Sequence, residues 1–432
     1  MLQVVNPATE EVICELQEDT VDTVGAKFRA ARDAQPQWAS RPLLERIECV
    51  KKFSRLLQER QSSLATTLTS EVGKPLKQAM GEIAGVVPRI EFFVENIEKV
   101  MEAQTLLESG SGSLVERVSY EPLGVVGNIS AWNYPYFVGA NVFVPALLVG
   151  NAVLYKPSEF STLTGLAIGE LLLESGVPED VFSVVVGGGR VGQALCEEPL
   201  GGMFFTGSHS TGVKVAAAAA RRMMRLQVEL GGKDPVYVAP DVDVRAAAEG
   251  IADGAFYNAG QSCCSVERVY VHQSIYHSFV EHFTSAVSNF VCGDPREKDT
   301  YIGPLTRGSH RSFLEAQVRD ALTKGARLLT GGKSVNGKGY YFEPTVLSDV
   351  NHEMDLMREE SFGPIIGLQS VETDDEAIQL MNDTRYGLTA SVFTADKNRA
   401  DKMLAGLNAG SVYWNCCDRV SPRLPWTGWN DS

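Results

Sequence analysis

Two successive series of short apolar strands that alternate with helices predict an α/β protein made of two doubly wound units. The first series spans residues 124–230 and the second spans residues 244–381. Short apolar strands between helices indicate a parallel sheet that helices cover on both faces. The chain has 432 residues, which is more than one hydrophobic core usually supports, so two or three domains are expected.

The part of the chain before the first series is predicted to be helical. Apolar residues recur at helical spacing in residues 20–105, as at Val24, Phe28 and Ala31, and several amphipathic helices fit this region. Residues 106–120 differ, because the glycine and serine run at 110–113 separates two short extended segments. We therefore expect a hairpin or small β arm here rather than a packed layer.

Capping and turn residues mark the ends of elements in the first series. A helix at 161–174 is expected to stop at Gly176, with Pro178 just beyond it. Ser208 is expected to cap a helix that runs through the alanines at 216–220. The strands of this series are predicted at 124–129, 152–155, 181–186, 203–205 and 226–230.

The second series repeats the alternation. Its helices are predicted at 244–256, 274–290, 312–324 and 374–381, and its strands at 266–271, 326–329 and 365–369. The boundary between the series falls near Gly231 and Gly232. We expect a first domain of residues 1–105 and 123–231, an arm of residues 106–122 and a second domain of residues 232–432, with a cleft between the two domains.

Composition excludes several classes of protein. The net charge of −15 argues against a general affinity for nucleic acid or for an anionic membrane. No stretch approaches the run of about 20 apolar residues that a membrane span needs, and the N-terminus does not read as a signal peptide. The eight cysteines show no paired framework and the histidines show no zinc spacing, so we expect reduced thiols, no metal and a cytoplasmic location.

A cysteine and a glutamate carry the strongest chemical signal. Cys263 lies in the segment Gly-Gln-Ser-Cys, and Glu229 lies in the segment Val-Glu-Leu-Gly-Gly-Lys. A cysteine can attack a carbonyl carbon, and a separate carboxylate can activate water. Together the two side chains supply the parts for opening a covalent intermediate by hydrolysis.

Three further motifs suit a nucleotide, although each also has a structural interpretation. Residues 187–192 match G-x-G-x-x-G, but no acidic residue follows where a ribose-binding carboxylate is expected, and a tight turn needs glycine anyway. Gly207 and Ser208 stand at a helix N-terminus, which favours an anion or is a plain N-cap. Lys156 and Glu159 suit ribose hydroxyls, or they are two solvated charges.

Two more segments are ambiguous when taken singly. Asn133 can point its amide at a developing oxyanion, or it forms a turn with Pro135. Glu360 and Phe362 can hold a flat cofactor ring and its ribose, or they belong to a charged loop. All of these motifs nevertheless occur in one order in one chain.

That order resembles the aldehyde dehydrogenase superfamily over essentially the whole chain, from Val-Asn-Pro-Ala-Thr at 5–9 to Leu-Pro-Trp at 424–426. The glutamate and cysteine segments resemble the two signatures of this family. The resemblance implies two Rossmann-like doubly wound domains, one for the cofactor and one catalytic, with a small β oligomerisation arm. It implies that Cys263 is the nucleophile, that Glu229 is the general base, and that Asn133 with the Cys263 backbone N–H stabilises the oxyanion.

The resemblance also implies a nicotinamide dinucleotide as cofactor. Lys156 and Glu159 would bind the adenosine ribose, Ser208 the pyrophosphate, and Glu360 and Phe362 the nicotinamide riboside. A carboxylate at Glu159 would accept a hydrogen bond from the ribose 2′-hydroxyl and repel a 2′-phosphate, so we expect NAD rather than NADP. The full set assigned to the cofactor is Ser130, Trp132, Lys156, Glu159, Gly187, Gly207, Ser208, Gly231, Glu360 and Phe362.

The reaction implied by the resemblance oxidises an aldehyde to a carboxylic acid. Cys263 would form a thiohemiacetal and then a thioester, which a water activated by Glu229 would hydrolyse. Arg419 or Arg423 could serve as a clamp for an anionic substrate, although neither forms a clear one. The substrate tunnel is expected at Tyr134, Phe137, Asn141, Ser262, Cys264 and Trp426.

The chain departs from the pattern of the family at both ends. The β-hairpin that usually precedes the Asn-Pro-Ala-Thr segment is expected to be absent, and so is the final strand that normally pairs with a neighbouring subunit. We therefore expect a homo-oligomer, as a dimer or a weakened assembly, with a tetramer only if that strand exists. Two alternatives stay open: a coenzyme A-acylating enzyme, against which Glu229 counts, and a catalytically weak or structural member of the family.

Overall fold

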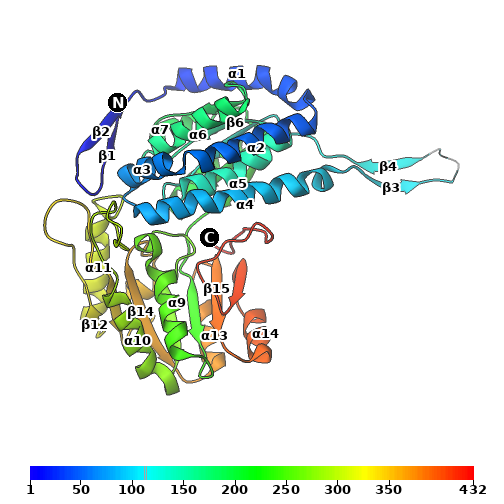
Figure 1. Cartoon of the computed structure of the whole chain (residues 1–432). Helices are drawn as coiled ribbons and strands as arrows, with labels where there is room; N and C mark the ends of the chain where they lie inside the picture. The colour runs from blue at the N-terminus through cyan, green and yellow to red at the C-terminus, as the bar shows by residue number, and fades with distance from the viewer. Residues whose placement is uncertain (111, 113) are drawn as a thin grey trace.

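The computed structural model describes residues 1–110, 112 and 114–432, so the predicted turn at 110–113 lies partly outside the described residues. Figure 1 shows two α/β units, one above the other, with a long hairpin that projects from the upper unit. Among the residues that the structure describes, no helix is both long enough and apolar enough to cross a membrane.

The first unit is built on a parallel sheet of five strands in the order β7-β6-β5-β8-β9. Alternate residues of β6 (Ala152–Lys156) face hydrophobic cores on opposite sides of the sheet. Val153 and Tyr155 pack with the helices of residues 43–175, whereas Ala152 and Leu154 pack with α1 and α7 on the other face. The strands are β5 (Val125–Ile129), β6 (Ala152–Lys156), β7 (Phe182–Val184), β8 (Gly202–Thr206) and β9 (Arg225–Glu229).

Helices account for most of the remaining residues of this unit, as the amphipathic pattern predicts. Four long helices precede the sheet, and four more connect its strands. They are α1 (Val21–Ser40), α2 (Leu43–Glu59), α3 (Gln61–Val72), α4 (Leu76–Met101), α5 (Pro135–Leu148), α6 (Thr162–Ser175), α7 (Gly189–Cys196) and α8 (His209–Arg221).

The second unit holds a sheet of seven strands in the order β12-β13-β14-β11-β10-β15-β16. All neighbours are parallel except the edge pair β12 and β13. The strands are β10 (Pro235–Val238), β11 (Arg268–His272), β12 (Arg327–Thr330), β13 (Thr345–Ser348), β14 (Ile365–Val371), β15 (Thr389–Phe393) and β16 (Ser411–Trp414). The helices are α9 (Val244–Phe256), α10 (Tyr276–Ser288), α11 (His310–Thr323), α12 (Asp355–Arg358), α13 (Asp374–Asn382) and α14 (Lys397–Ala405).

The predicted fold class is confirmed, and the predicted helix at 244–256 coincides with α9. Several elements were not predicted, namely β1 (Leu2–Val5), β2 (Val12–Leu16), β10, β13, β15, β16, α5, α12 and α14. The missed strands have four or five residues each, which is too short for a periodicity to be read. The predicted strand at 181–186 is also too long, since β7 covers only Phe182–Val184.

Residues 1–16 form a hairpin of β1 (Leu2–Val5) and β2 (Val12–Leu16), with the Asn-Pro-Ala-Thr segment in its turn. This hairpin reaches the second unit. The Tyr340 N–H donates to the Pro7 carbonyl over 2.9 Å, and the Gly339 N–H donates to the Glu10 carboxylate over 2.7 Å. The N-terminal hairpin is therefore hydrogen-bonded to the loop of the second unit that contains Gly339 and Tyr340.

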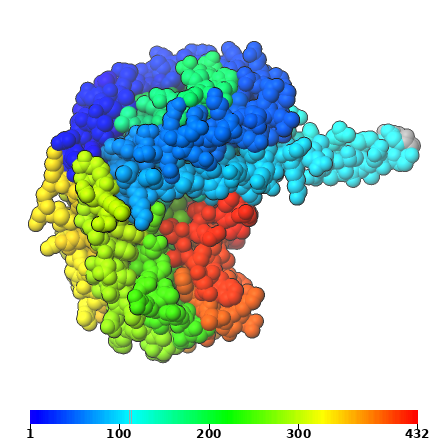
Figure 2. Space-filling model, in the orientation of Figure 1, coloured from blue at the N-terminus to red at the C-terminus, as the bar shows by residue number. Residues whose placement is uncertain are grey.

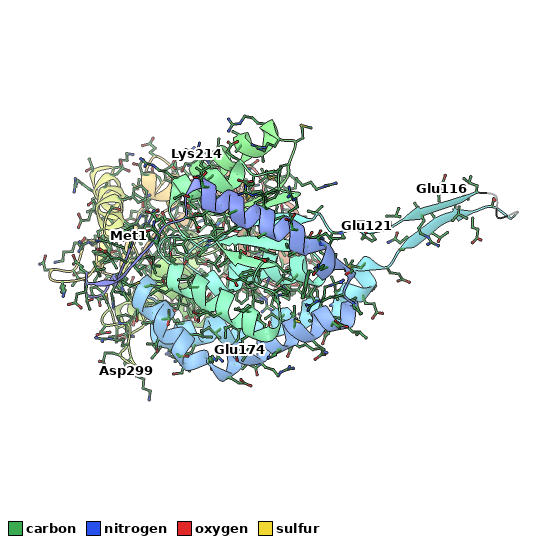
Figure 3. All side chains as sticks on the ribbon, turned by 90° about the horizontal axis from the view of Figure 1, so that it is seen from above. Met1, Glu116, Glu121, Glu174, Lys214 and Asp299 are labelled. Carbon is green, nitrogen blue, oxygen red and sulfur yellow. The ribbon has the colours of Figure 1, made fainter. Side chains whose placement is uncertain are left out.

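The predicted arm is an antiparallel pair of β3 (Gln104–Glu108) and β4 (Val115–Val118). All residues of both strands are exposed, and Figure 2 shows the arm standing away from the body. Figure 3 places Glu116 far out on it and Glu121 where it joins the body. Its exposed apolar side chains include Leu106, Leu107, Leu114, Val115 and Val118.

Candidate active site

A cavity of about 1120 Å³ lies at the carboxyl ends of β5, β6 and β8 and extends to residues of the second unit. In an open parallel sheet, ligands bind outside the carboxyl ends of strands where the strand order reverses. β5 has β6 on one side and β8 on the other, so the order reverses at this strand. The cavity therefore lies at the point where the order of the first sheet reverses, and part of its lining comes from the second unit.

Most of the predicted site residues line this one cavity. Both of the residues expected to act on a carbonyl, Cys263 and Asn133, are among them. The cofactor residues that line it are Ser130, Trp132, Lys156, Glu159, Gly207, Ser208, Gly231, Glu360 and Phe362. The structure thus brings together segments that are up to 232 positions apart, from Ser130 to Phe362.

Gly187 is not among the residues that line the cavity, whereas Gly189 and Gly192 are. Gly187 has a φ of +148°, and a Cβ there would meet Val191 Cγ2 at 2.4 Å. A close turn between β7 and α7 therefore requires this glycine. The structure supports the turn interpretation of Gly187 rather than a direct contact with a ligand.

Glu229 ends β9 and is buried, and it is not itself a lining residue although Leu230 and Gly231 are. The Gln227 amide donates to one carboxylate oxygen over 3.0 Å, and the other oxygen, Oε2, has no partner among the described residues. Burial raises the pKa of Glu229 to about 7, against the smaller lowering effect of Gln227. A carboxyl group with this pKa is suited to exchange a proton near neutral pH.

The turn before Cys263 has an unusual backbone. Asn258, Ala259 and Gly260 have φ values of 54°, 56° and 67°, so three successive residues are left-handed. The Asn258 amide donates to the Gln261 carbonyl over 3.0 Å, and the Asn133 amide donates to the same oxygen over 3.1 Å. Two amides from different units therefore hold the backbone two residues before the cysteine.

Gly260→Ala is expected to destabilise the protein and to disturb the cysteine turn. A Cβ at this position would lie 2.3 Å from the Gly363 carbonyl oxygen, and the positive φ disfavours any side chain. We expect a loss of about 2–4 kcal/mol in the free energy of unfolding, measured by urea denaturation. Gly250→Ala is the matched control, because it lies in α9 with nothing within 4 Å, and it should leave stability unchanged or increase it.

A buried ion pair, which no sequence pattern indicated, supports the loop that carries Glu360 and Phe362. Lys233 donates over 2.5 Å to the carboxylate of Glu267. That carboxylate accepts the backbone N–H groups of Ser361 and Phe362, each over 2.8 Å. Phe362 is left-handed, with a φ of 49°, and these bonds stabilise that conformation.

Glu360 and Phe362 face the first unit across the cavity. The Gly232 N–H donates to the Glu360 carboxylate over 3.1 Å, and a Cβ on Gly231 would overlap this carboxylate at 2.3 Å. Burial raises the pKa of Glu360 to about 8. The Phe362 ring meets Trp132 edge to face, with 5.5 Å between the ring centroids. An aromatic wall and a carboxyl group thus stand side by side.

The residues predicted to bind ribose and phosphate lie at the other side of the cavity. Lys156 is buried and donates to the Pro157 carbonyl over 3.1 Å, and burial lowers the pKa of its ammonium group. Ser208 is the N-cap of α8, but its hydroxyl bonds Ser210 and Thr211 side chains instead of a backbone N–H. The first backbone N–H groups of this 13-residue helix therefore remain available to an anion.

The residues predicted to form a substrate tunnel are not among those that line the cavity described above, and two of them share one partner. Ser262 and the Cys264 thiol each donate to the Asp418 carboxylate over 3.2 Å. Tyr134 lies under the Lys74 ammonium group, 3.7 Å from its ring centroid. Asp418 lies in the segment of residues 415–426, which the resemblance places along the substrate tunnel together with Trp426.

The whole chain, residues 1–432, matches the model of the aldehyde dehydrogenase family. The protein therefore belongs to this family, and the predicted resemblance is confirmed. It is 38% identical to lactaldehyde dehydrogenase of Escherichia coli strain K12 over 96% of this chain and 87% of that relative. Oxidation of an aldehyde to the acid is the activity that family membership supports.

Two solved structures share the fold. An NAD-dependent aldehyde dehydrogenase from Sinorhizobium meliloti has a TM-score of 0.96 and 35% identity, covering 100% of this chain and 86% of its own. An NADP-dependent enzyme of E. coli also has a TM-score of 0.96, with 33% identity and coverage of 100% and 90%. The α/β fold is thus shown, and a nicotinamide dinucleotide is the cofactor class of these neighbours.

Proposed function

We propose that the protein oxidises an aldehyde to a carboxylic acid through a thioester on Cys263, with a nicotinamide dinucleotide as oxidant. One observation carries this proposal. Cys263 and Asn133 line the same cavity as the carboxyl, amine and aromatic groups expected to hold the dinucleotide. Family membership supports the same reaction class.

The residues present fit such a cofactor. The cavity of about 1120 Å³ exceeds the range of roughly 300–1,000 Å³ that is usual for small-molecule sites. It offers a helix N-terminus at Ser208 for phosphates, Lys156 and Glu159 for one ribose, and Glu360 for the other. When bound, the nicotinamide ring accepts the hydride that leaves the substrate carbon.

Cys263, Asn133 and Glu229 would then have separate roles in the reaction. The Cys263 sulfur adds to the aldehyde carbon, and the resulting oxyanion receives hydrogen bonds from the Asn133 amide and the Cys263 N–H. Asn133 now donates to the Gln261 carbonyl, which holds its amide beside the cysteine segment. After hydride loss, Glu229 takes a proton from the water that opens the thioester.

Glu229 also favours hydrolysis over transfer to coenzyme A. Its carboxyl group is buried, has one unpartnered oxygen and has a pKa of about 7. A group in this state can bind a proton from water at neutral pH, whereas an acylating enzyme has no use for such a base. Incubation with aldehyde and NAD, with and without coenzyme A, tests this choice. NADH formation that required coenzyme A would contradict the hydrolytic reaction.

We expect a preference for NAD over NADP, at least about tenfold in kcat/KM, because the Glu159 carboxylate repels a 2′-phosphate. Glu159→Gln should reduce this preference, chiefly by improving kcat/KM for NADP. Glu170→Gln on the exposed side of α6 removes the same charge away from the cavity and should change nothing. A wild-type protein that prefers NADP would contradict the expectation, and the family neighbours include both types.

The broadest test is a screen for NADH formation over aliphatic, aromatic, amino- and semialdehydes. Activity with any of these classes would support an aldehyde dehydrogenase, and the rates would rank the substrate classes. Binding of NAD without turnover of any aldehyde would instead support a structural role. The homo-oligomeric state and the cytoplasmic location stay predictions.

A further inference from the structure

Arg89 is a buried cation that forms no ion pair with a carboxylate of the described residues. Its side chain lies in α4 and the residue is only 4% exposed. Nη1 donates to the Asn141 side-chain oxygen over 2.7 Å. Nε and Nη2 have no hydrogen-bond partner among the residues that the structure describes, and Arg89 forms no ion pair with them. Burial lowers the pKa of this guanidinium to about 10.

The two unpartnered nitrogens form one edge of the guanidinium group. The N–H bonds of Nε and Nη2 point the same way, and such a fork matches the two oxygens of a carboxylate. The Phe137 ring lies 4.4 Å from the guanidinium carbon, and Asn141 holds the opposite nitrogen. These two contacts therefore orient the plane of the guanidinium group without a ligand.

Both of these contacts are residues of the expected substrate tunnel. Phe137 and Asn141 lie in α5, four and eight residues after Asn133. Four residues separate Phe137 and Asn141, about one turn of the helix, so both side chains lie on the same face of α5. Arg89, Phe137 and Asn141 are not among the residues that line the cavity with the nucleotide groups, and the charge of Arg89 is felt by Tyr413 of the second unit.

A buried guanidinium with two unsatisfied nitrogens is costly, because desolvation of a charge is offset only by a partner. The known contacts supply one amide oxygen and one ring face. An anion from outside the chain would complete this set of contacts. A substrate held by Cys263 at one end can carry that anion at its other end.

We propose that Arg89 binds the distal carboxylate of the substrate, so that the preferred substrates are short aldehydes that carry a carboxylate, the ω-oxo acids. This proposal rests on the proposed function and names its substrate class. It also replaces the clamps considered from the sequence. Arg423 is exposed and lies 5.9 Å from the Phe92 ring centroid, and Arg419 is also exposed, with its backbone carbonyl accepting the Tyr413 hydroxyl.

Matched pairs of aldehydes test the proposal in the wild-type protein. We expect kcat/KM for 4-oxobutanoate and 5-oxopentanoate to exceed that for butanal and pentanal by at least about tenfold, because only the acids form the charged pair. The difference should lie mainly in KM, since the carboxylate is far from the reacting carbon. Equal or better use of the neutral aldehydes would overturn the proposal while leaving the dehydrogenase function in place.

Variants of Arg89 test whether this residue causes the preference for oxo acids. Arg89→Met should lower kcat/KM for the oxo acids by at least about tenfold and change that for the neutral aldehydes little. Arg89→Lys keeps the charge without the fork and should recover only part of the loss. Lys77→Met, exposed on the same helix, is the matched control and should behave like wild type. An Arg89→Met protein that loses both substrate types equally would assign Arg89 a structural role and overturn the proposal.

A binding measurement tests the role of Arg89 separately from the proposed dehydrogenase activity. It uses the wild-type protein, so it does not require that a variant folds. In calorimetry with the wild-type protein, pentanedioate should bind at least about tenfold more tightly than pentanoate. This holds even if no aldehyde is turned over, which would contradict the proposed function alone. Equal binding of the two acids would overturn the role of Arg89.

Discussion

Cys263→Ala is expected to abolish aldehyde-dependent NADH formation, with a fall in kcat of at least about 1,000-fold. Without the thiol no thiohemiacetal forms, and an aldehyde has no oxyanion to expel the hydride. The alanine variant should still bind NAD, because the nucleotide residues of the cavity come from other segments. Initial rates of NADH formation and the dissociation constant of NAD are the two measurements.

Cys264→Ala is the control for this experiment. Cys264 is the next residue, but it is buried and donates its thiol proton to Asp418 instead of lining the cavity. Its loss should reduce the rate by far less than the loss of Cys263. A Cys264→Ala protein as inactive as Cys263→Ala, or an active Cys263→Ala protein, would contradict the assignment of the nucleophile.

Glu229→Gln is expected to stop the reaction after its first half. Hydride transfer depends on Cys263, so each site should release about one NADH in a rapid burst, followed by a steady state slowed by roughly 100- to 10,000-fold. Rapid-mixing measurements of NADH separate the two phases. Loss of the burst itself would contradict a role limited to hydrolysis, and an unchanged steady state would contradict any role as base.

The pH dependence has a definite sign. Burial raises the pKa of Glu229 to about 7, and only the deprotonated carboxylate can act as a base, so the hydrolytic rate should rise as pH increases through 7. A raised folded-state pKa also means that ionisation of Glu229 costs stability as pH rises from its unfolded value to about 7. At pH values above 7, the Glu229→Gln protein should accordingly have a higher melting temperature than the wild type. Melting temperatures of both proteins, measured at several pH values below and above 7, test this.

Sequence patterns were sufficient for the fold class, and with the family resemblance they also named many of the residues that line the cavity, although Arg307, His310 and Phe313 were not among them. Strands such as β5 and β6 are buried along their whole length and read as apolar runs between glycines. The motifs around Glu229 and Cys263 each stand at a loop after an element, and the parallel topology brings such loops to one edge. Short strands such as the interior β10 and the edge strand β16 were not predicted, because four residues are too few to show a period.

What the sequence did not reveal depends on pairs of residues far apart in the chain. Lys233 and Glu267 read as ordinary charges, and only the fold buries them together beneath Ser361. Arg89 is similar, although one local sign existed, since it interrupts the buried apolar stripe of α4 between Val86 and Ile90. The left-handed Asn258 and Ala259 had no such sign, because neither residue type requires a positive φ.

The segment from Glu229 to Lys233 holds three functional contacts at alternate positions. Glu229 is the proposed base, Gly231 packs against the Glu360 carboxylate, and Lys233 bonds the carboxylate that supports Phe362. All five residues of this segment are buried. The groups proposed for oxidation and the group proposed for hydrolysis would therefore be held in place by one buried segment of five residues.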